Sequence, residues 1–450
     1  MPSTQPARGM RDFLPDDVRR RAHVIEAIAA VYERYGFEPL ETPAVENIDT
    51  LMGKYGDEGD KLIFRILKRG ETDGPAVADL ALRYDLTVPL ARVVAEYRGK
   101  LPRLFKRYQI QPVWRADRPQ RGRFREFYQC DVDAVGSTSV LVEAELCAAA
   151  SDALATLGFR EFTVRLNHRQ ALSGLLEAAG VEPARHGEAL VAIDKLDKIG
   201  RDGVAEELAQ RGIGADATRV LLAFFAEASA SATAPDPSRN AHVLGQMAQL
   251  IGGNETGRRG LDELERIARY TGDTAAAGRV AVDPSLARGL SYYTGAIMEI
   301  AVPDLAGSLG GGGRYDNLVG MFLGEHVPAC GFSLGLERII VVMSERGMFP
   351  AAVGARHAEV VVTLWNMERA ADALALARDL RSAGLRVDAY PEAEKIGKQL
   401  KFAASRGVPF VTVCGDDEAA RGEVSVKDLR SGEQQSVPRG DVAAFIRARL

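Results

Sequence analysis

Apolar positions recur along the chain with helical spacing in some stretches and with strand-like spacing in others. Between residues 19 and 35 apolar side chains return every three or four positions, and Pro15 and Gly36 mark a start and a stop, which predicts a helix. Short extended runs continue to about residue 133, and a second helix is predicted at 140–157. A run of hairpin-like strands with few helices between them favours a mixed, mainly antiparallel sheet.

The later parts of the chain follow other patterns. Residues 172–275 are rich in Ala, Glu and Leu and predict a mostly helical insertion, after which strand signals return near Val280. From His357 onward apolar runs alternate with helical segments, which is typical of a parallel sheet with right-handed crossovers. A hairpin that turns at Ser431–Gly432 is predicted near the end of the chain.

These patterns predict an α+β protein in which a mainly antiparallel sheet is flanked by helices. The first domain would span 1–347, interrupted by the 172–275 insertion, and residues 348–356 would form a linker. Residues 357–450 would form a separate C-terminal α/β domain. The length of 450 residues fits two or three domains, because single hydrophobic cores stop growing well below that size.

The segment from Arg107 to Asp133 predicts two short strands joined by an arginine-rich turn. Side chains alternate across a strand, so Arg115 and Asp117 would share one face of the first strand. The same alternation groups one face of the second strand, which carries Phe127, Gln129, Asp131 and Asp133. Such a hairpin could offer guanidinium groups to phosphates, a ring to a planar base and carboxylates to an ammonium group.

The local charge favours a ligand over an ordinary solvated turn. Residues 98–125 contain ten Arg or Lys and one acidic residue, Asp117, whereas the whole chain has a net charge of −5. A basic segment in an acidic chain usually meets a ligand or a partner. On this segment alone, a hairpin with a solvated basic turn remains the alternative.

A candidate ammonium site lies in the sequence LRYDLTVPLAR, residues 82–92. Asp85 and Thr87 lie two positions apart, so they would share a face if this stretch is a strand that Pro89 ends. A carboxylate beside a hydroxyl could accept hydrogen bonds from a substrate ammonium group. The alternative is a turn at the end of the strand in which Asp85 acts as a cap.

Two glycine-containing stretches could frame a small polar ligand. RGLSYY at 288–293 places Arg288 beside two tyrosines, although such a group also occurs in surface hairpins. GGGGRYD at 310–316 would allow a ligand close to the backbone, with a flexible loop as the alternative. It lacks the spacing of a P-loop or of a dinucleotide-binding motif, which disfavours both of those sites.

GFSLGLERIIVVM, residues 331–343, predicts a strand, a tight glycine and an apolar helix. An arginine at the start of a buried helix is costly unless it is paired or meets an anion. Arg338 therefore either binds an anion or pairs with Glu337 or another acid.

Cysteine spacing and hydropathy limit the cofactors and the location. The four cysteines are scattered, without a CxxC pair or clustered histidines, so neither a protein metal site nor a disulfide framework is expected. Apolar runs fall well short of about 18 residues, and the N-terminus lacks the apolar region of a signal peptide. We expect a cytoplasmic protein without a membrane span.

In their order and combination, these motifs resemble those of class II aminoacyl-tRNA synthetases, and specifically the histidyl-tRNA synthetase family. FEPLETP, which ends at Pro43, resembles the first class motif, WRAD with RGRFREFYQ resembles the second, and GFSLGLER with Arg338 resembles the third. RGLSYY and GGGRYD are similar to signatures of the histidyl branch. The resemblance covers nearly the whole chain and implies a C-terminal anticodon-binding domain.

The resemblance implies an activity and its partners. The enzyme would activate L-histidine with ATP and Mg²⁺ to histidyl-adenylate and transfer the histidyl group to the 3′ end of tRNA-His. It would act as a homodimer, with the segment around Pro43 at the interface. No editing domain is evident in the sequence.

The resemblance also implies roles for individual residues, of which Arg115 and Arg288 would be catalytic. The histidine site would comprise Asp85, Thr87, Arg115, Gln129, Asp133, Arg288, Tyr292, Tyr293 and Tyr315. The ATP site would comprise Arg115, Asp117, Arg123, Phe127 and Arg338. Arg118 and Gln120 would contact the acceptor end of the tRNA.

The chain departs from the family pattern at two positions. The second motif usually has Arg-x-Glu, whereas this chain has Arg115-Ala116-Asp117, whose acidic side chain is one methylene shorter. The family's RGLDYY stands here as RGLSYY, so position 291, a serine, receives no role.

Three other functions fit part of the pattern. A regulatory paralogue would bind histidine without charging tRNA, but such proteins typically lose the anticodon domain and parts of the ATP motifs, which this chain keeps. A prolyl or threonyl type of synthetase would be expected to lack RGLSYY and GGGRYD. A pure RNA-binding module would leave the acids Asp85 and Asp133 without a purpose.

Overall fold

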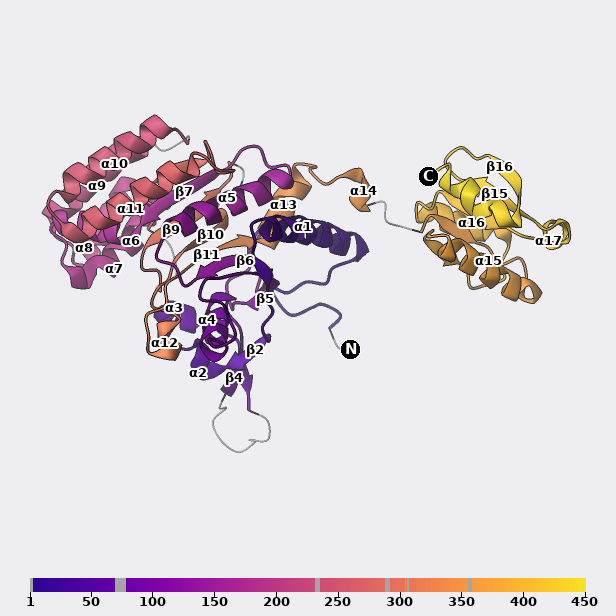
Figure 1. Ribbon diagram of the computed structural model, residues 1–450, viewed down its shortest axis with the longest axis horizontal. Coiled ribbons are helices and arrows are strands. Elements are labelled where there is room, and N and C mark those ends of the chain that lie inside the picture. Colours follow the sequence, from indigo (N-terminus) through magenta and orange to yellow (C-terminus); the bar gives the residue numbers. More distant parts are fainter. Residues whose placement is uncertain are drawn as a thin grey trace. The chain divides into compact units, whose positions relative to one another are not determined.

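The structure is a computed structural model that describes residues 3–68, 78–230, 235–287, 292–303, 305, 307–354 and 358–450. The chain forms two compact units, Met1–Phe349 and Pro350–Leu450 (Figure 1). Among the described residues, none of the helices is both long and apolar enough to cross a membrane.

Within the described residues, the first unit is built on an eight-stranded sheet with the order β1-β5-β6-β11-β10-β9-β7-β8. The strands are β1 (Glu38–Pro39), β5 (Phe105–Trp114), β6 (Glu126–Val135), β7 (Thr163–His168), β8 (Val280–Val282), β9 (Ala296–Ala301), β10 (Ser308–Arg314) and β11 (Ala329–Gly335). Pairing is parallel at the two edges, β1 with β5 and β7 with β8, and antiparallel between them. The predicted mainly antiparallel sheet and the predicted 107–133 hairpin are therefore confirmed.

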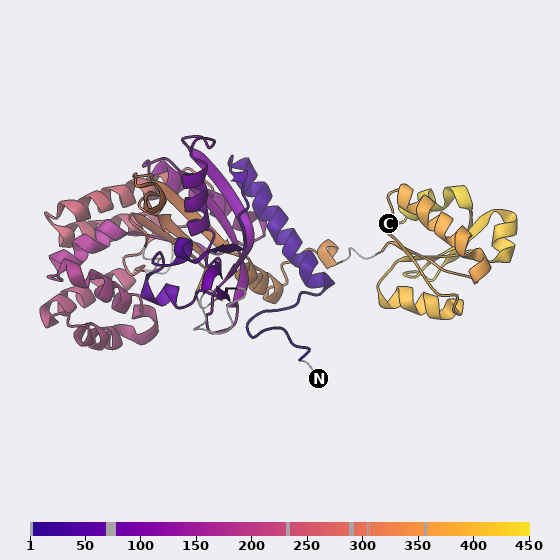
Figure 2. The same ribbon diagram turned by 90° about the horizontal axis from the view of Figure 1, so that it is seen from below.

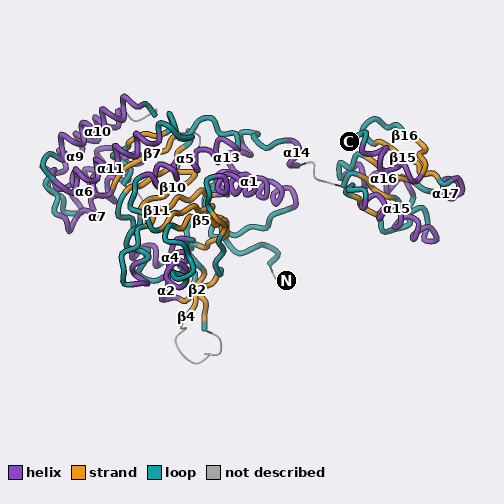
Figure 3. Tube along the Cα trace, viewed as in Figure 1, coloured by secondary structure: helices purple, strands orange, loops and turns teal. Residues whose placement is uncertain are grey.

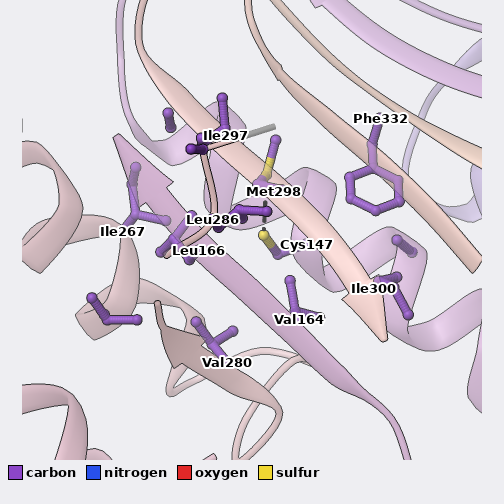
Figure 4. Close-up of a cluster of buried hydrophobic side chains, with 14 of the residues drawn as sticks. Cys147, Val164, Leu166, Ile267, Val280, Leu286, Ile297, Met298, Ile300 and Phe332 are labelled. Carbon is purple, nitrogen blue, oxygen red and sulfur yellow. Dashed lines mark hydrogen bonds between the residues drawn. The ribbon is translucent and has the colours of Figure 1, made fainter. Parts of the chain in front are cut away.

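Three helices, α1 (Pro15–Arg34), α5 (Leu141–Thr156) and α13 (Leu336–Glu345), pack together along one face of this sheet (Figure 2). The alternation of side chains directs Cys130 and Val132 of β6 into the apolar core under these helices. Figure 4 shows part of this core, where Cys147 of α5 lies against Met298 of β9, with 3.4 Å between the two sulfur atoms. The same alternation leaves Gln129, Asp131 and Asp133 on the opposite face.

The helical region between β7 and β8 contains α6 (Arg169–Ala178), α7 (His186–Ile193), α8 (Leu196–Gln210), α9 (Ala215–Ala230), α10 (Pro237–Ile251) and α11 (Glu255–Thr271). Helices α6 and α11 approach closely at two glycines. A Cβ atom on Gly174 would lie 2.5 Å from the Cα atom of Gly257, so both positions must lack a side chain. These helices bury their apolar stripes in the same core as the sheet, and Asn254 caps α11 by accepting from the backbone N–H of Gly257.

A smaller layer lies on the other side of the main sheet, and Figure 3 shows its short strands and helices. It contains β2 (Val45–Asn47), β3 (Arg65–Leu67), β4 (Ala78–Leu82), α2 (Ile48–Leu51), α3 (Gly56–Asp60), α4 (Thr87–Glu96) and α12 (Gly320–Leu323). A second apolar cluster joins this layer to β5 and β6 through Leu51, Val88, Phe105 and Val135.

The second unit has a five-stranded sheet within its described residues, ordered β13-β12-β14-β15-β16. Its elements are α14 (Ala351–Gly354), β12 (Val360–Val362), α15 (Ala370–Ser382), β13 (Val387–Ala389), α16 (Ile396–Ser405), β14 (Phe410–Val413), α17 (Asp416–Arg421), β15 (Glu423–Asp428), β16 (Gln434–Pro438) and α18 (Val442–Arg447). β13, β12 and β14 are parallel, and β15 and β16 form an antiparallel hairpin. The predicted α/β domain with a final hairpin is confirmed.

Two local predictions about strands are wrong. Asp85 and Thr87 do not share a strand, because β4 ends at Leu82 and Thr87 begins helix α4. Pro89 fits that helix because the N–H groups of its first turn need no intrahelical partner. Arg115 and Asp117 follow β5 rather than belong to it, because regular pairing ends at Trp114 and the chain then enters the arginine-rich connection.

The glycine cluster is also not a flexible loop, because it forms strand β10 in the middle of the main sheet. A Cβ atom on Gly310 would lie 2.4 Å from the carbonyl oxygen of Ser333, and one on Gly312 would lie 2.1 Å from that of Gly331. These glycines therefore permit a close approach of β10 to β11 that a residue with a side chain would prevent.

Candidate active site

A cavity of about 1190 Å³ opens on the sheet face that carries Gln129, Asp131 and Asp133. Side chains of β6, β10 and β11, the start of α4 and the β5–β6 connection line it. Its size and its mixture of aromatic and charged side chains are those of a ligand-binding site.

Asp85 lies at one end of this cavity, just before α4, and is buried. Its Oδ1 atom accepts hydrogen bonds from the Val88 backbone N–H at 3.0 Å and from the Tyr55 hydroxyl at 3.0 Å. Its Oδ2 atom accepts from the Tyr292 hydroxyl at 3.1 Å. Burial raises the pKa of Asp85, while these donors oppose the rise. Asp85 therefore both caps α4 and lines the cavity, which joins the two alternatives given by the sequence.

Asp133 lines the same cavity and is also buried, with only 2% of its surface exposed. Its Oδ1 atom accepts a hydrogen bond from Tyr315, and its Oδ2 atom lies 2.8 Å from Nη2 of Arg107. Burial raises the pKa of Asp133, and the Arg107 guanidinium and the Tyr315 hydroxyl oppose that rise. Tyr292 contacts the ring of Tyr293 and that of Tyr315 edge to face, so the three tyrosines form one aromatic wall.

Tyr315 is held in place by its neighbour in the sequence. Arg314 points away from the cavity and forms a buried bidentate ion pair with Glu143 of α5, at 2.6 and 2.8 Å. It also contacts Asp316, whose Oδ1 atom accepts from the backbone N–H of Ala329 on β11. The GGGGRYD sequence thus anchors Tyr315 from behind the sheet.

The connection after β5 supplies a second, basic part of the cavity lining, which we call the basic end. Nε of Arg115 donates to the carbonyl oxygen of Tyr84 at 3.0 Å, and its guanidinium lies 4.3 Å from the Tyr84 ring centroid and 5.1 Å from that of Phe127. Asp117 pairs with Arg123 at 2.9 and 3.0 Å. Arg115, Arg123 and Arg338 all line the cavity, so this end suits an anionic, aromatic ligand such as a nucleotide.

Arg338 at the start of α13 donates to the carbonyl oxygen of Ser308 on β10. Glu337 faces a different group, because its side chain pairs with Arg21 of α1 at 2.8 Å and accepts from the backbone N–H of Tyr128 at 2.9 Å. The alternative in which Arg338 pairs with Glu337 is therefore not what the structure has.

The structure brings together nearly all of the residues named from the sequence. Those that line the cavity are Asp85, Thr87, Arg115, Asp117, Gln120, Arg123, Phe127, Gln129, Asp133, Tyr292, Tyr293, Tyr315 and Arg338. Arg118 is not among the lining residues in the described part of the chain. Arg288 and Ser291 lie outside the described residues.

Sequence reasoning missed several residues that the site depends on. Tyr55 and Arg107 bind the two buried carboxylates, and Arg165 and Glu299 line the cavity as an ion pair of 3.2 Å. A signal for Arg107 was present, because polar side chains alternate with apolar ones along β5 as they do along β6. Within the described residues, no group of three or more His, Cys, Asp or Glu side chains could hold a metal ion.

Gly331 of β11 lies opposite Asp133 in the register, and a Cβ atom on it would lie 1.8 Å from Oδ1 of Asp133. We expect Gly331→Ala to lower the free energy of unfolding by about 1–3 kcal/mol, because the buried carboxylate must move out of its pocket. Chemical denaturation would measure this. Gly245→Ala in α10 is the control, because its Cβ would meet nothing within 4 Å and should leave stability unchanged or slightly higher. Equal stability of both variants would contradict the close approach.

Comparisons with known proteins agree with this arrangement. A family model described as histidyl-tRNA synthetase matches residues 9–339, and one described as an anticodon binding domain matches residues 359–449. Histidine–tRNA ligases of Gloeobacter violaceus and Porphyromonas gingivalis are each 42% identical to this chain, with 98% of both chains covered in each case. The crystal structure of histidyl-tRNA synthetase from a Nostoc species is 32% identical, covers 100% of both chains and gives a TM-score of 0.80.

Proposed function

Because the chain belongs to the histidyl-tRNA synthetase family, we propose that the cavity is the active site in which L-histidine and ATP meet. The protein is a histidine–tRNA ligase, which activates L-histidine with ATP to histidyl-adenylate and transfers the histidyl group to the 3′ end of tRNA-His. The observation that carries the assignment of the site is that one cavity is lined both by the buried carboxylates Asp85 and Asp133 and by arginines.

The acidic end is assigned to the amino acid. Gln129 has a buried side-chain oxygen with no hydrogen-bond partner among the described residues, and Oδ2 of Asp85 accepts from Tyr292 alone among them, so both retain capacity for an ammonium donor. Thr87 lines the cavity beside Asp85. These three residues would bind the α-ammonium group.

The imidazole ring would lie beyond the ammonium group, against Asp133. Tyr292, Tyr293 and Tyr315 would enclose the ring, and Asp133 would accept one of its N–H hydrogens. A site that must hydrogen-bond its substrate can reject isosteres by roughly 10⁴ to 10⁵, because its buried polar groups are otherwise left unpaired.

The basic end is assigned to ATP. Phe127 would stack on the adenine and Asp117 would accept from its amino group, while Arg123 and Arg338 would contact the outer phosphates. Mg²⁺ would arrive with ATP as part of the substrate.

In the first step, the histidine carboxylate attacks the α-phosphorus of ATP and pyrophosphate leaves. Negative charge grows on the phosphoryl oxygens, and Arg115 and Arg288 would stabilise it electrostatically. The nucleophile is already an anion, so no protein base is needed. In the second step, the terminal ribose hydroxyl of tRNA-His attacks the carbonyl carbon of the mixed anhydride. The ester bond forms as the bond to the phosphate oxygen breaks, AMP leaves, and the hydroxyl proton passes to solvent.

The tRNA would meet both units of the protein. The second unit, which matches the anticodon-binding family over residues 359–449, would bind the anticodon. Arg118 and Gln120 in the β5–β6 connection would contact the acceptor end. We also assign the protein to the cytoplasm and to a homodimer with the segment around Pro43 at the interface.

The regulatory paralogue is the second candidate, and no finding favours it. One solved structure described as an ATP phosphoribosyltransferase regulatory subunit/histidyl-tRNA synthetase, from Bacillus halodurans, is 21% identical with a TM-score of 0.71, which speaks for the fold alone. The residues proposed for ATP are all present in this chain and line the cavity.

Pyrophosphate exchange with ATP, measured with each of the twenty amino acids, tests the site assignment. We expect exchange with L-histidine alone, because other side chains do not supply the ring N–H that Asp133 would accept. Exchange with another amino acid would overturn the assignment of the acidic end. Histidine binding without exchange would point to the regulatory paralogue.

Removal of residues 357–450 separates the two steps of the reaction. We expect this truncation to impair tRNA charging far more than adenylate formation, because the cavity is formed within the first unit. Parallel assays of pyrophosphate exchange and tRNA aminoacylation would measure the two losses. Equal losses would mean that the second unit chiefly stabilises the first.

Sedimentation equilibrium tests the dimer. The chain has a mass of 48.6 kDa, so a homodimer should sediment with about twice that mass at micromolar concentration. A stable species with the mass of a single chain would contradict the proposal.

A further inference from the structure

Arg107 is one of the largest side chains that are completely buried in the protein, and it lies beside the proposed imidazole pocket. It stands on β5 directly opposite Asp133 of β6 in the sheet register. Asp131, two residues earlier on β6, points to the same face as Asp133. An arginine cannot lose its proton in a protein, so this position places a permanent positive charge behind two carboxylates.

The contacts of Arg107 are concentrated on these carboxylates. Its Nη2 atom lies 2.8 Å from Oδ2 of Asp133 and 3.9 Å from Oδ2 of Asp131, and it donates to the carbonyl oxygen of Leu86 at 3.3 Å. Its Nε and Nη1 atoms have no hydrogen-bond partner among the described residues. The positive charge is thus offset chiefly by the two aspartates.

We propose that Arg107 is a positioning residue for histidine specificity, which holds Asp133 as an oriented anion that accepts an imidazole N–H. The inference rests on the proposed assignment of the imidazole ring to Asp133. Arg107 does not line the cavity within the described residues, so it would act on the substrate only through Asp133.

The charge balance explains why such a residue is needed. Burial raises the pKa of both Asp131 and Asp133, and neighbouring carboxylates add to the rise. Asp133 and Asp85 raise the pKa of Asp131, and Asp85 raises that of Asp133. A protonated Asp133 would present a donor rather than an acceptor to a ring N–H. The Arg107 guanidinium opposes the effect of burial on both aspartates.

Other groups that face Asp133 also affect its ionisation. Tyr315, which follows β10, donates a hydrogen bond to Asp133, and Tyr293, before β9, lies nearby. Asp85, at the start of α4, adds a like charge. On β11 the facing residue is Gly331, which contributes no side chain, with the Cys330 thiol beside it. Arg107 is the cation among these neighbours.

The test is the pH dependence of kcat/KM for histidine in pyrophosphate exchange, using the full-length protein. For Arg107→Leu we expect the KM for histidine at neutral pH to rise about tenfold or more, with the KM for ATP changed less than about twofold. The acidic limb of the profile should move to higher pH by about one unit or more, because Asp133 loses the cation that favours its ionised form. Arg107→Lys keeps the positive charge, so its acidic limb should lie close to that of the wild-type protein.

Asp131→Asn is a nearly isosteric second variant with the opposite expectation. Removing the like charge favours the ionised form of Asp133, so the acidic limb should move to lower pH. The matched control is Lys106→Leu. Lys106 neighbours Arg107 on β5, but it points to the other face and pairs with Glu145 of α5 at 2.9 Å. This control should keep the wild-type profile.

The results separate the inference from the proposed function. Opposite shifts for Arg107→Leu and Asp131→Asn, with recovery by Arg107→Lys, would support the inference. An unshifted limb in both variants, or a loss in Arg107→Leu that affects histidine and ATP equally, would overturn it while leaving the active site in place. If Arg107→Leu does not fold, the Asp131→Asn shift decides. Wild-type protein without histidine-dependent exchange would overturn the proposed site itself, and the inference with it.

Discussion

Burying carboxylates beside partners that favour their ionised form is the constraint on which the first unit depends. Asp85 and Asp133 are both almost fully buried, and an ionised carboxylate in such a place is stable only when donors or cations surround it. The partners of Asp133 come from β5 and from the turn after β10, and those of Asp85 come from α4, Tyr55 and Tyr292. Segments distant in the sequence must therefore be in register before either acid has its partners.

A second requirement is room for the buried side chains, which glycines in β10 and β11 provide. Gly331 leaves room for the Asp133 carboxylate, and Gly312 leaves room for the backbone of Gly331. The arginine that follows the glycines points backwards to Glu143, and this ion pair fixes the tyrosine that hydrogen-bonds to Asp133. The sequence GGGGRYD thus supplies the glycine that makes room for β11, the arginine that binds Glu143 and the tyrosine that donates to Asp133.

The sequence predicted the regular elements well and the contacts between them poorly. The predicted helices at 19–35 and 140–157 correspond to α1 and α5. Apolar residues at helical spacing indicated the first. The predictions at Pro89 and at the glycine cluster were wrong. A proline fits both the end of a strand and the first turn of a helix, and a run of glycines fits both a loop and two strands that approach closely. The role of Arg107 depends on the register between β5 and β6, which the predicted hairpin alone does not fix. The family resemblance named most of the lining residues, but not Arg165 and Glu299, and it did not name Tyr55 and Arg107, which contact the buried carboxylates.

The two ends of the proposed site are joined through adjacent residues of one loop. The Tyr84 carbonyl oxygen holds the Arg115 guanidinium at 3.0 Å, and Asp85, the next residue, would hold the substrate ammonium group. In the proposed assignment, the histidine carboxylate lies between them and the α-phosphate lies at Arg115. A shift of this loop would therefore move the arginine and the ammonium site together, which preserves the distance between nucleophile and phosphorus. Such coupling matters because a reaction that needs no protein base depends on proximity and on the field of its arginines.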